Sequence, residues 1–183
     1  MKIVIGITGA SGAIYAKRLL EKLAVLESEG NIAVIFSDKA KQVWQHELGN
    51  EDFQKINFPI FKPEDFFAPP ASGSASYEAM IICPCSMGSL ARIANGISDE
   101  LITRSADVML KEKRKLILVT RESPLSLIHI RNMKLAASAG AIILPASPSF
   151  YSKPGTITEI IDTVIDRALK LAGYDLPTFH WGE

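Results

Sequence analysis

Glycine and hydroxyl side chains gather directly after the first apolar run of the chain, in the segment Thr8-Gly9-Ala10-Ser11-Gly12-Ala13. Glycines let the backbone turn tightly, and free amides at the start of a following helix favour a phosphate group. The spacing Gly6-x-x-Gly9-x-x-Gly12 is neither the dinucleotide pattern G-x-G-x-x-G nor a Walker loop with its lysine. The segment therefore favours a phosphate site to which Ser11 adds a hydroxyl; a tight turn without a ligand is the alternative.

A second loop of small and hydroxyl residues, Ser86-Met87-Gly88-Ser89, follows a later apolar run and also opens a helical pattern. Two such loops on neighbouring strands can hold one nucleotide from both sides. Ser37 directly follows another run, where a dinucleotide fold would place an acid for the ribose, and Asp38 comes one residue too late. This weakens an NAD interpretation and leaves a mononucleotide open.

Several charged or aromatic residues lie where they could meet an anion. Arg121 comes just after a run that ends near Val119, and this position favours an anion or flavin contact over a surface ion pair with the next glutamate. Arg104 and Lys111 are seven residues apart on one predicted helix and share a face. A solvated face is the ordinary interpretation of this pair, and also of Arg167. Tyr151 fits a core position and a substrate contact equally well.

The cysteines and histidines form no recognisable reactive set. Cys83 and Cys85 lie in an apolar segment with no histidine nearby in sequence, which favours small buried residues over a nucleophile. His46, His129 and His180 are widely spaced and fit no zinc pattern. We expect no metal site and a reducing compartment.

The elements that must position these residues alternate along the chain. Short runs rich in isoleucine and valine are typical of buried parallel strands, and amphipathic helical patterns lie between them. This alternation predicts a three-layer α/β, Rossmann-like domain with a mostly parallel sheet, in which ligands bind outside the carboxyl ends of the strands. The predicted strands are Ile3–Ile7, Ile32–Phe36, Ala79–Cys83, Leu116–Val119 and Ala141–Leu144, and the predicted helices after the one that begins near Tyr15 are Lys39–Leu48, Met87–Ala94, Glu100–Lys113, Ser126–Ala139 and Thr158–Leu171.

Length and net charge limit the number of domains and the classes of binding partner. The 183 residues suit a single domain, 1–183, and the formal net charge of +0 provides no field to draw the chain to nucleic acid or to an anionic membrane. No segment reads as a transmembrane helix, so we expect a cytoplasmic protein. The proline-rich segment 58–76 is expected to form a long ordered loop over the ligand-binding edge. The tail 177–183, with Phe179 and Trp181, is expected to pack on a neighbouring subunit.

Taken together, these motifs resemble the flavin prenyltransferase family, the UbiX/Pad-type flavoproteins, almost from end to end. The matching pieces are GITGASGAIYAKRLL at 6–20, APPASGS at 68–74, ICPCSMGSLARIANG at 82–96, ELITRSADVMLKEKR at 100–114, LVTRESPLSLIHIRNM at 118–133, ILPASPSFYSKP at 143–154 and HWGE at 180–183. The resemblance implies binding of FMN and a dimethylallyl phosphate, and metal-independent transfer of the prenyl group to N5 and C6 of reduced flavin. It also implies a homododecamer with sites at subunit interfaces, and a prenylated FMN product that serves a UbiD-type decarboxylase, in ubiquinone biosynthesis or in phenolic acid metabolism.

The resemblance also carries residue roles. It implies that FMN is bound by Gly9, Ala10, Ser11, Ser37, Ser86, Met87, Gly88, Ser89 and Arg121. It implies that the prenyl phosphate is surrounded by Arg104, Lys111, Tyr151, Arg167 and Trp181, with Glu47, Glu122 and Ser11 as the candidate catalytic residues. The chemistry fits, because a prenyl phosphate ionises by losing an anion that cations and a tyrosine hydroxyl can stabilise. Glu47, Glu122 or the phosphate itself could be the proton-transfer base.

Three alternatives stand beside this interpretation. A flavin-dependent cysteine decarboxylase would share the fold and FMN but use an active-site histidine, and no histidine lies between His46 and His129. A non-catalytic FMN-binding protein would not need the cations Arg104, Lys111 and Arg167. An NAD oxidoreductase is disfavoured by the loop spacing and by Ser37. The preference between a monophosphate and a pyrophosphate donor stays open.

Overall fold

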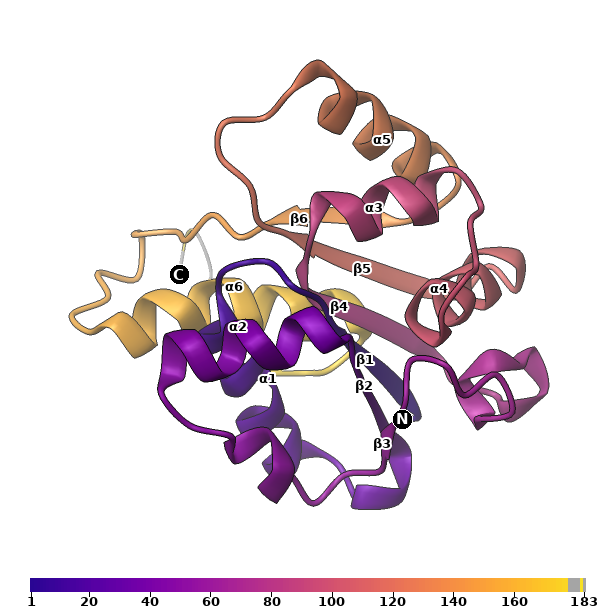
Figure 1. Cartoon of the computed structure of the whole chain (residues 1–183). Helices are drawn as coiled ribbons and strands as arrows, with labels where there is room; N and C mark the ends of the chain where they lie inside the picture. Colours follow the sequence, from indigo (N-terminus) through magenta and orange to yellow (C-terminus); the bar gives the residue numbers. More distant parts are fainter. Residues whose placement is uncertain (178–181, 183) are drawn as a thin grey trace.

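A computed structural model describes residues 1–177 and 182 and shows a sheet covered by helices on both faces (Figure 1). The strands are β1 (Ile3–Ile7), β2 (Ile32–Phe36), β3 (Ile60–Phe61), β4 (Ala79–Cys85), β5 (Lys115–Thr120) and β6 (Ile142–Pro145). The α-helices are α1 (Ala13–Leu26), α2 (Asp38–Leu48), α3 (Met87–Ala94), α4 (Leu101–Lys111), α5 (Leu127–Ser138) and α6 (Ile157–Ala172). Every predicted strand and helix is present, with ends that shift by at most two residues.

The sheet is parallel throughout, in the order β3-β2-β1-β4-β5-β6. The chain builds outward from β1 in one direction and then returns to add β4 on its other side. The boundary between β1 and β4 is therefore the topological switch point, where open α/β sheets bind ligands. The two-residue strand β3 was not predicted, because so short and partly exposed an element leaves no periodic pattern.

Two apolar cores lie on opposite faces of the sheet. Along β1 the side chains of Ile3, Ile5 and Ile7 pack into the core covered by α1, α2 and α6, whereas Val4 packs into the core covered by α3, α4 and α5. This alternation follows from the period of two in a strand, and burial on both faces explains the unbroken apolar sequence of β1. The predicted three-layer Rossmann-like α/β architecture is confirmed.

The proline-rich segment 58–76 is ordered, but it does not lie where the sequence suggested. It contains β3 and two short 3₁₀ helices, and it runs along α4 toward the amino end of β4. The Pro63 carbonyl accepts from the Leu101 amide at 2.7 Å, and the Ala71 carbonyl accepts from Arg104 Nε at 3.1 Å. Because these contacts anchor the segment to α4, it is a flank of the second core and not a cover over the carboxyl edge.

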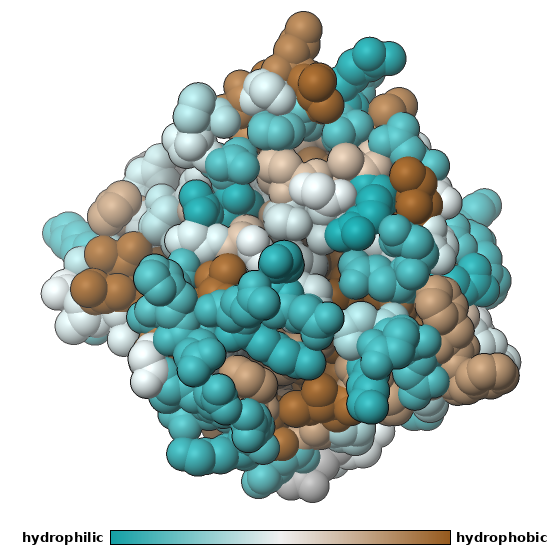
Figure 2. Space-filling view, viewed as in Figure 1, coloured by the Kyte–Doolittle hydropathy of each residue, from teal (hydrophilic) through white to brown (hydrophobic). Residues whose placement is uncertain are grey.

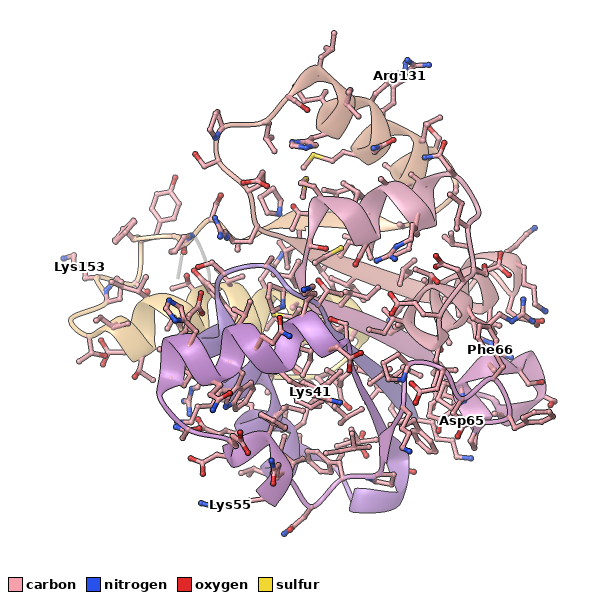
Figure 3. All side chains as sticks on the ribbon, viewed as in Figure 1. Lys41, Lys55, Asp65, Phe66, Arg131 and Lys153 are labelled. Carbon is pink, nitrogen blue, oxygen red and sulfur yellow. The ribbon has the colours of Figure 1, made fainter. Side chains whose placement is uncertain are left out.

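Helix α5 is the least embedded helix of the second face. Only Asn132 and Ala136 are buried along it, and Leu127 and Ile128 are 79% and 71% exposed. Apolar atoms accordingly show at the top of the molecule over α5 (Figure 2). Arg131 points outward from the same helix (Figure 3). This surface is available to another protein chain.

The sequence predicts that the tail 177–183 packs on a neighbouring subunit. Its aromatic residues Phe179 and Trp181 lie outside the described residues, as does most of the segment. Within the described part, none of the helices is long and apolar enough to cross a membrane.

Candidate functional site

Three helices begin around the switch point, at the carboxyl edge of the sheet. They are α1 after β1, α2 after β2 and α3 after β4 (Figure 1). Each helix start carries amide groups without partners inside the helix and a partial positive charge. Parallel strands bring these starts to one edge, so the sequence-predicted loops around Ser11, Ser37 and Ser86 are neighbours in space.

The loops after β1 and β4 are directly bonded through Thr8. Its hydroxyl donates to the Pro84 carbonyl at 2.8 Å and accepts from the Ser86 amide at 2.8 Å. Thr8 is 2% exposed, so these bonds are shielded from water. The two predicted cofactor loops are thus held as one unit. Sequence reasoning did not single out Thr8, because a threonine in a glycine loop carries no signal of what it bonds.

Gly9 allows the first loop to approach α2 closely. A Cβ atom added to Gly9 would lie 2.4 Å from the Lys39 Cβ, a distance that no side chain can occupy. Gly12 has φ 114°, in the left-handed region that glycine adopts without strain. Gly9 is therefore required by the close approach to the start of α2, and Gly12 by its backbone conformation.

Glu47, from the last turn of α2, reaches back to the start of α1. Its carboxylate accepts from the Gly12 amide at 2.9 Å and from the Ala13 amide at 2.8 Å. Burial alone would raise the pKa of Glu47, but hydrogen bonds from Ser11 and these amides, together with the charge of Arg121, lower it. The sequence suggested that these amides face a phosphate. Within this chain they hold a carboxylate, and Ser11 lies close enough to contribute to its lowered pKa.

Arg121 connects the loop after β5 to the first loop. Its Nε donates to the Ser11 carbonyl at 3.0 Å, and its amide donates to the Cys85 carbonyl at 3.3 Å. Within residues 1–177 no acceptor meets its two Nη nitrogens, so this end of the guanidinium is available to an anion. The neighbouring Glu122 is exposed and accepts from the Ser123 amide at 3.0 Å.

The remaining predicted cofactor residues have local structural roles. Ser37 begins α2, and its hydroxyl accepts from the Ala40 amide at 3.1 Å. Ser86 begins α3 in the same way, accepting from the Ser89 amide at 3.2 Å and donating to the Ser89 hydroxyl at 3.1 Å. Met87 and Ser89 are buried and Gly88 is exposed. The hydroxyls of Ser37 and Ser86 are thus helix caps. The backbone of these residues forms the rim of the site.

The two cysteines are buried, and neither has the surroundings of a nucleophile. Cys83 and Cys85 are both 0% exposed. Burial raises the pKa of the Cys85 thiol to about 12, and it raises that of Cys83 further. A thiol with so high a pKa carries almost no thiolate at neutral pH. The prediction that these are small buried core residues is confirmed.

A cleft of about 760 Å³ lies between β6, the loop after it and α6. It is lined by hydroxyl groups, by carboxylates of α6 and by Arg167. Tyr151 lies in the same loop and is 65% exposed. The acids on this part of α6 are paired: Asp162 with Arg18 at 2.7 Å, and Asp166 with Lys22 at 2.6 Å. Sequence reasoning missed the lining residues Ser147, Ser149, Ser152 and Thr163, although three serines after one strand end were a usable signal.

Arg104 and Lys111 are not brought to this cleft. Both lie on α4, on the face of the sheet opposite to α6 and Arg167. Arg104 pairs with Asp107 at 2.8 Å, and Lys111 pairs with Glu112 at 2.6 Å. A single chain therefore separates the cations that the sequence grouped around one phosphate.

Among the described residues, no group of three or more histidine, cysteine, aspartate or glutamate side chains could hold a metal ion.

A doubly wound parallel sheet with joined glycine and serine loops at its switch point, and an arginine beside them, defines a nucleotide- or flavin-binding protein. Comparisons with known proteins narrow this class. The chain matches the family Flavoprotein over residues 1–169. Flavin prenyltransferase UbiX of Methanocaldococcus jannaschii is 44% identical, over 100% of this chain and 99% of that protein. The chain belongs to the UbiX family of flavin prenyltransferases, and the resemblance seen in the sequence is confirmed.

Solved structures agree with this assignment. AnUbiX (PadA1), in complex with FMN and dimethylallyl pyrophosphate, superposes with a TM-score of 0.93 at 39% identity, covering 100% of this chain and 98% of that one. A dodecameric FMN-dependent UbiX-like decarboxylase from Escherichia coli O157:H7 gives 0.91 at 38% identity, covering 98% and 99%. The cysteine decarboxylase TvaF from thioviridamide biosynthesis gives 0.66 at 17% identity and shares the fold alone.

Proposed function

We propose that the protein joins a dimethylallyl group from dimethylallyl phosphate to N5 and C6 of reduced FMN, closing a fourth ring. One observation carries the proposal. The chain matches AnUbiX along its whole length, and the solved complex of that protein contains both FMN and a dimethylallyl donor. The chain offers places for two such ligands: Arg121 presents its Nη atoms beside the switch-point loops, and a separate cleft with Arg167 lies between the loop after β6 and α6.

The switch-point loops would hold FMN. The backbone of Gly9, Ala10 and Ser11 and the start of α3 at Ser86 frame it from two sides, and Arg121 presents its Nη atoms. When bound, reduced flavin supplies the electron-rich nucleophile. The chain's part is to orient it, to exclude water and to neutralise phosphate.

Arg167 and Tyr151 would hold the leaving phosphate. A guanidinium binds two phosphate oxygens in a fixed geometry, and a phenol donates a further hydrogen bond. Both act on the developing negative charge as the allylic carbon–oxygen bond weakens. Asp162 pairs with Arg18 and Asp166 pairs with Lys22, so these carboxylates do not neutralise the charge of Arg167.

Glu47 and Ser11 are the best-placed groups for proton transfer. They lie close together at the start of α1, where the Glu47 carboxylate is held by the Gly12 and Ala13 amides in its ionised form, the form that accepts a proton. Glu122 is exposed beside Arg121 and is the second candidate. The phosphate set free in the reaction is the third.

The complete site requires more than one copy of the chain. Arg104 and Lys111 lie across the sheet from Arg167, so only another subunit could add them to its cleft. The exposed apolar residues of α5 offer a contact surface, and the E. coli relative is a dodecamer. We propose a homododecamer whose sites lie between subunits, and a UbiD-type decarboxylase as recipient of the product.

The test is the mass of the flavin. The purified protein is incubated without oxygen with FMN, dithionite and dimethylallyl phosphate, and the flavin is extracted. A flavin heavier by one prenyl unit, absent when the protein is first heat-denatured, is the expected result. Unmodified FMN recovered from folded protein would overturn the proposal. That outcome would direct attention to a binding protein, or to release of carbon dioxide from thiol substrates.

A further inference from the structure

The pairing of β1 with β4 stops before the two loops begin. The ladder runs from the pair Ile3 and Ala79 to the pair Gly6 and Ile82. Beyond it the β4 backbone is irregular, because the register of its pairing with β5 shifts between Ile82 and Cys85. Regular sheet hydrogen bonds therefore do not fix how far apart the loops lie at the point where a ligand would enter.

Beyond the end of the ladder, Thr8 bonds the chain after β1 to the end of β4 and to the loop that follows it. Its amide donates to the Pro84 carbonyl at 3.3 Å, its hydroxyl donates to the same carbonyl at 2.8 Å, and the Ser86 amide donates to that hydroxyl at 2.8 Å. The hydroxyl is used both as donor and as acceptor, and the residue is buried. A bond made on both sides by one short, stiff side chain leaves little freedom to the groups it joins.

The groups that Thr8 joins are those that must bind flavin. On one side the chain continues into Gly9, Ala10 and Ser11. On the other side Ser86 caps α3 through the Ser89 amide, so the position of the Ser86 backbone sets where that helix starts.

We propose that Thr8 is a positioning residue for FMN: its hydroxyl holds the loops after β1 and β4 at the separation the flavin requires. The inference rests on the proposed function, because it assumes that FMN lies between these loops. It makes a chemical demand that can be tested, namely a hydroxyl at this position and not merely a side chain of this shape.

Two substitutions separate hydroxyl from shape. Thr8→Val keeps the branched shape but leaves the Ser86 amide without its partner, and the Pro84 carbonyl keeps only the bond from the backbone amide of residue 8 at 3.3 Å. Thr8→Ser keeps the hydroxyl. The matched control is Thr103→Val, because the Thr103 hydroxyl is equally buried and also donates and accepts, to the Glu100 carbonyl at 3.0 Å and from the Glu100 amide at 3.3 Å. That site lies on α4, and among the described residues its hydroxyl bonds only to Glu100 and Asp99, not to either loop.

The measurements are the dissociation constant of FMN, by quenching of its fluorescence, and the Michaelis constants of both substrates. We expect Thr8→Val to weaken FMN binding about tenfold or more, because the Ser86 amide loses its partner and the side-chain link between the two loops is lost. Its KM for reduced FMN should rise more than that for dimethylallyl phosphate, and saturating flavin should restore most of kcat. Thr8→Ser should bind within about threefold of the wild type, and Thr103→Val should lower the melting temperature without changing FMN affinity.

Failure of the Thr8 inference and failure of the proposed reaction give different results. Wild-type affinity in Thr8→Val, or equal losses in Thr8→Val and Thr103→Val, would overturn the inference, because the hydroxyl would then have a structural role only. Wild-type protein that binds FMN but forms no prenylated product would overturn the proposed reaction. The Thr8 comparison would still be decided in that case, by binding alone.

Discussion

The side chain of Arg121 donates from Nε to the carbonyl of Ser11 at 3.0 Å, although the two residues lie 110 positions apart. This bond leaves the Nη atoms of Arg121 for a ligand and fixes the guanidinium plane against the first loop. Arg121 can therefore hold the loop through Nε while its Nη atoms face a ligand, and a lysine, with a single nitrogen, could not do both in the same geometry.

Replacing Arg121 with alanine should therefore weaken FMN binding by about tenfold or more, since a charge-assisted contact and a loop bond are lost together. Arg121→Lys should recover only part of the loss. Fluorescence titration measures the affinity. Arg131→Ala, an exposed arginine on α5 pointing outward (Figure 3), is the matched control and should bind FMN as the wild type does. Equal affinity in Arg121→Ala would remove this residue from the flavin site.

Glu47→Gln should slow formation of prenylated FMN while FMN affinity stays near that of the wild type. Glutamine keeps the size of the side chain and can still accept from the Gly12 amide, but it cannot take up a proton. Single-turnover kinetics with bound flavin separates chemistry from binding. Unchanged turnover would assign Glu47 a structural role and leave Glu122 or the phosphate as the base.

The same carboxylate makes a pH-dependent contribution to stability. The folded-state pKa of Glu47 lies below its ordinary value of 4.5, so the stabilisation is fully present above that value and is lost as the pH falls through the folded pKa. At pH 7 the wild type should be more stable than Glu47→Gln by about 0.5–1 kcal/mol, as for a charged group at a helix start. Urea unfolding at neutral and acidic pH measures this. A difference that does not shrink in acid would contradict the assignment.

Mixed oligomers test whether one cleft draws on two chains. Arg104→Ala and Arg167→Ala should each be nearly inactive alone. If the residues serve one site from different subunits, co-assembled chains should regain activity, with about one site in four carrying both arginines in an equal random mixture. Prenylated FMN formed by the refolded mixture is the readout. No recovery in mixtures shown to be hybrid by mass spectrometry would contradict a site shared between subunits.

Neither cysteine should take part in the reaction. Native protein should react slowly with Ellman's reagent, because Cys83 and Cys85 are buried and the pKa of each thiol is raised, and unfolded protein should react at once. Cys85→Ala should keep kcat within about twofold and lose about 1–2 kcal/mol of stability to the cavity it leaves. Rapid labelling of native protein that abolishes activity would reverse this conclusion.

Local patterns were sufficient for the elements of the fold. The run Ile3–Ile7 and the serine at position 86 predict a buried strand and a helix start because burial on both faces and N-capping are decided within a few residues. The loop order also followed, since parallel strands deliver their following loops to one edge. Two-residue β3 and the path of segment 58–76 did not, because both depend on contacts with β2 and α4 that no local pattern encodes.

The family and the α/β architecture could be read from the sequence, because residue types and their spacing along one element are linear properties. Which candidate residues meet depends on the folded chain. It brought Glu47 to the start of α1, Arg121 to Ser11, and Thr8 between two loops, and it placed Arg104 and Lys111 across the sheet from Arg167. Such relations join residues tens of positions apart. They are fixed by how the helices pack on the two faces of the sheet, a packing that is not written in any one segment.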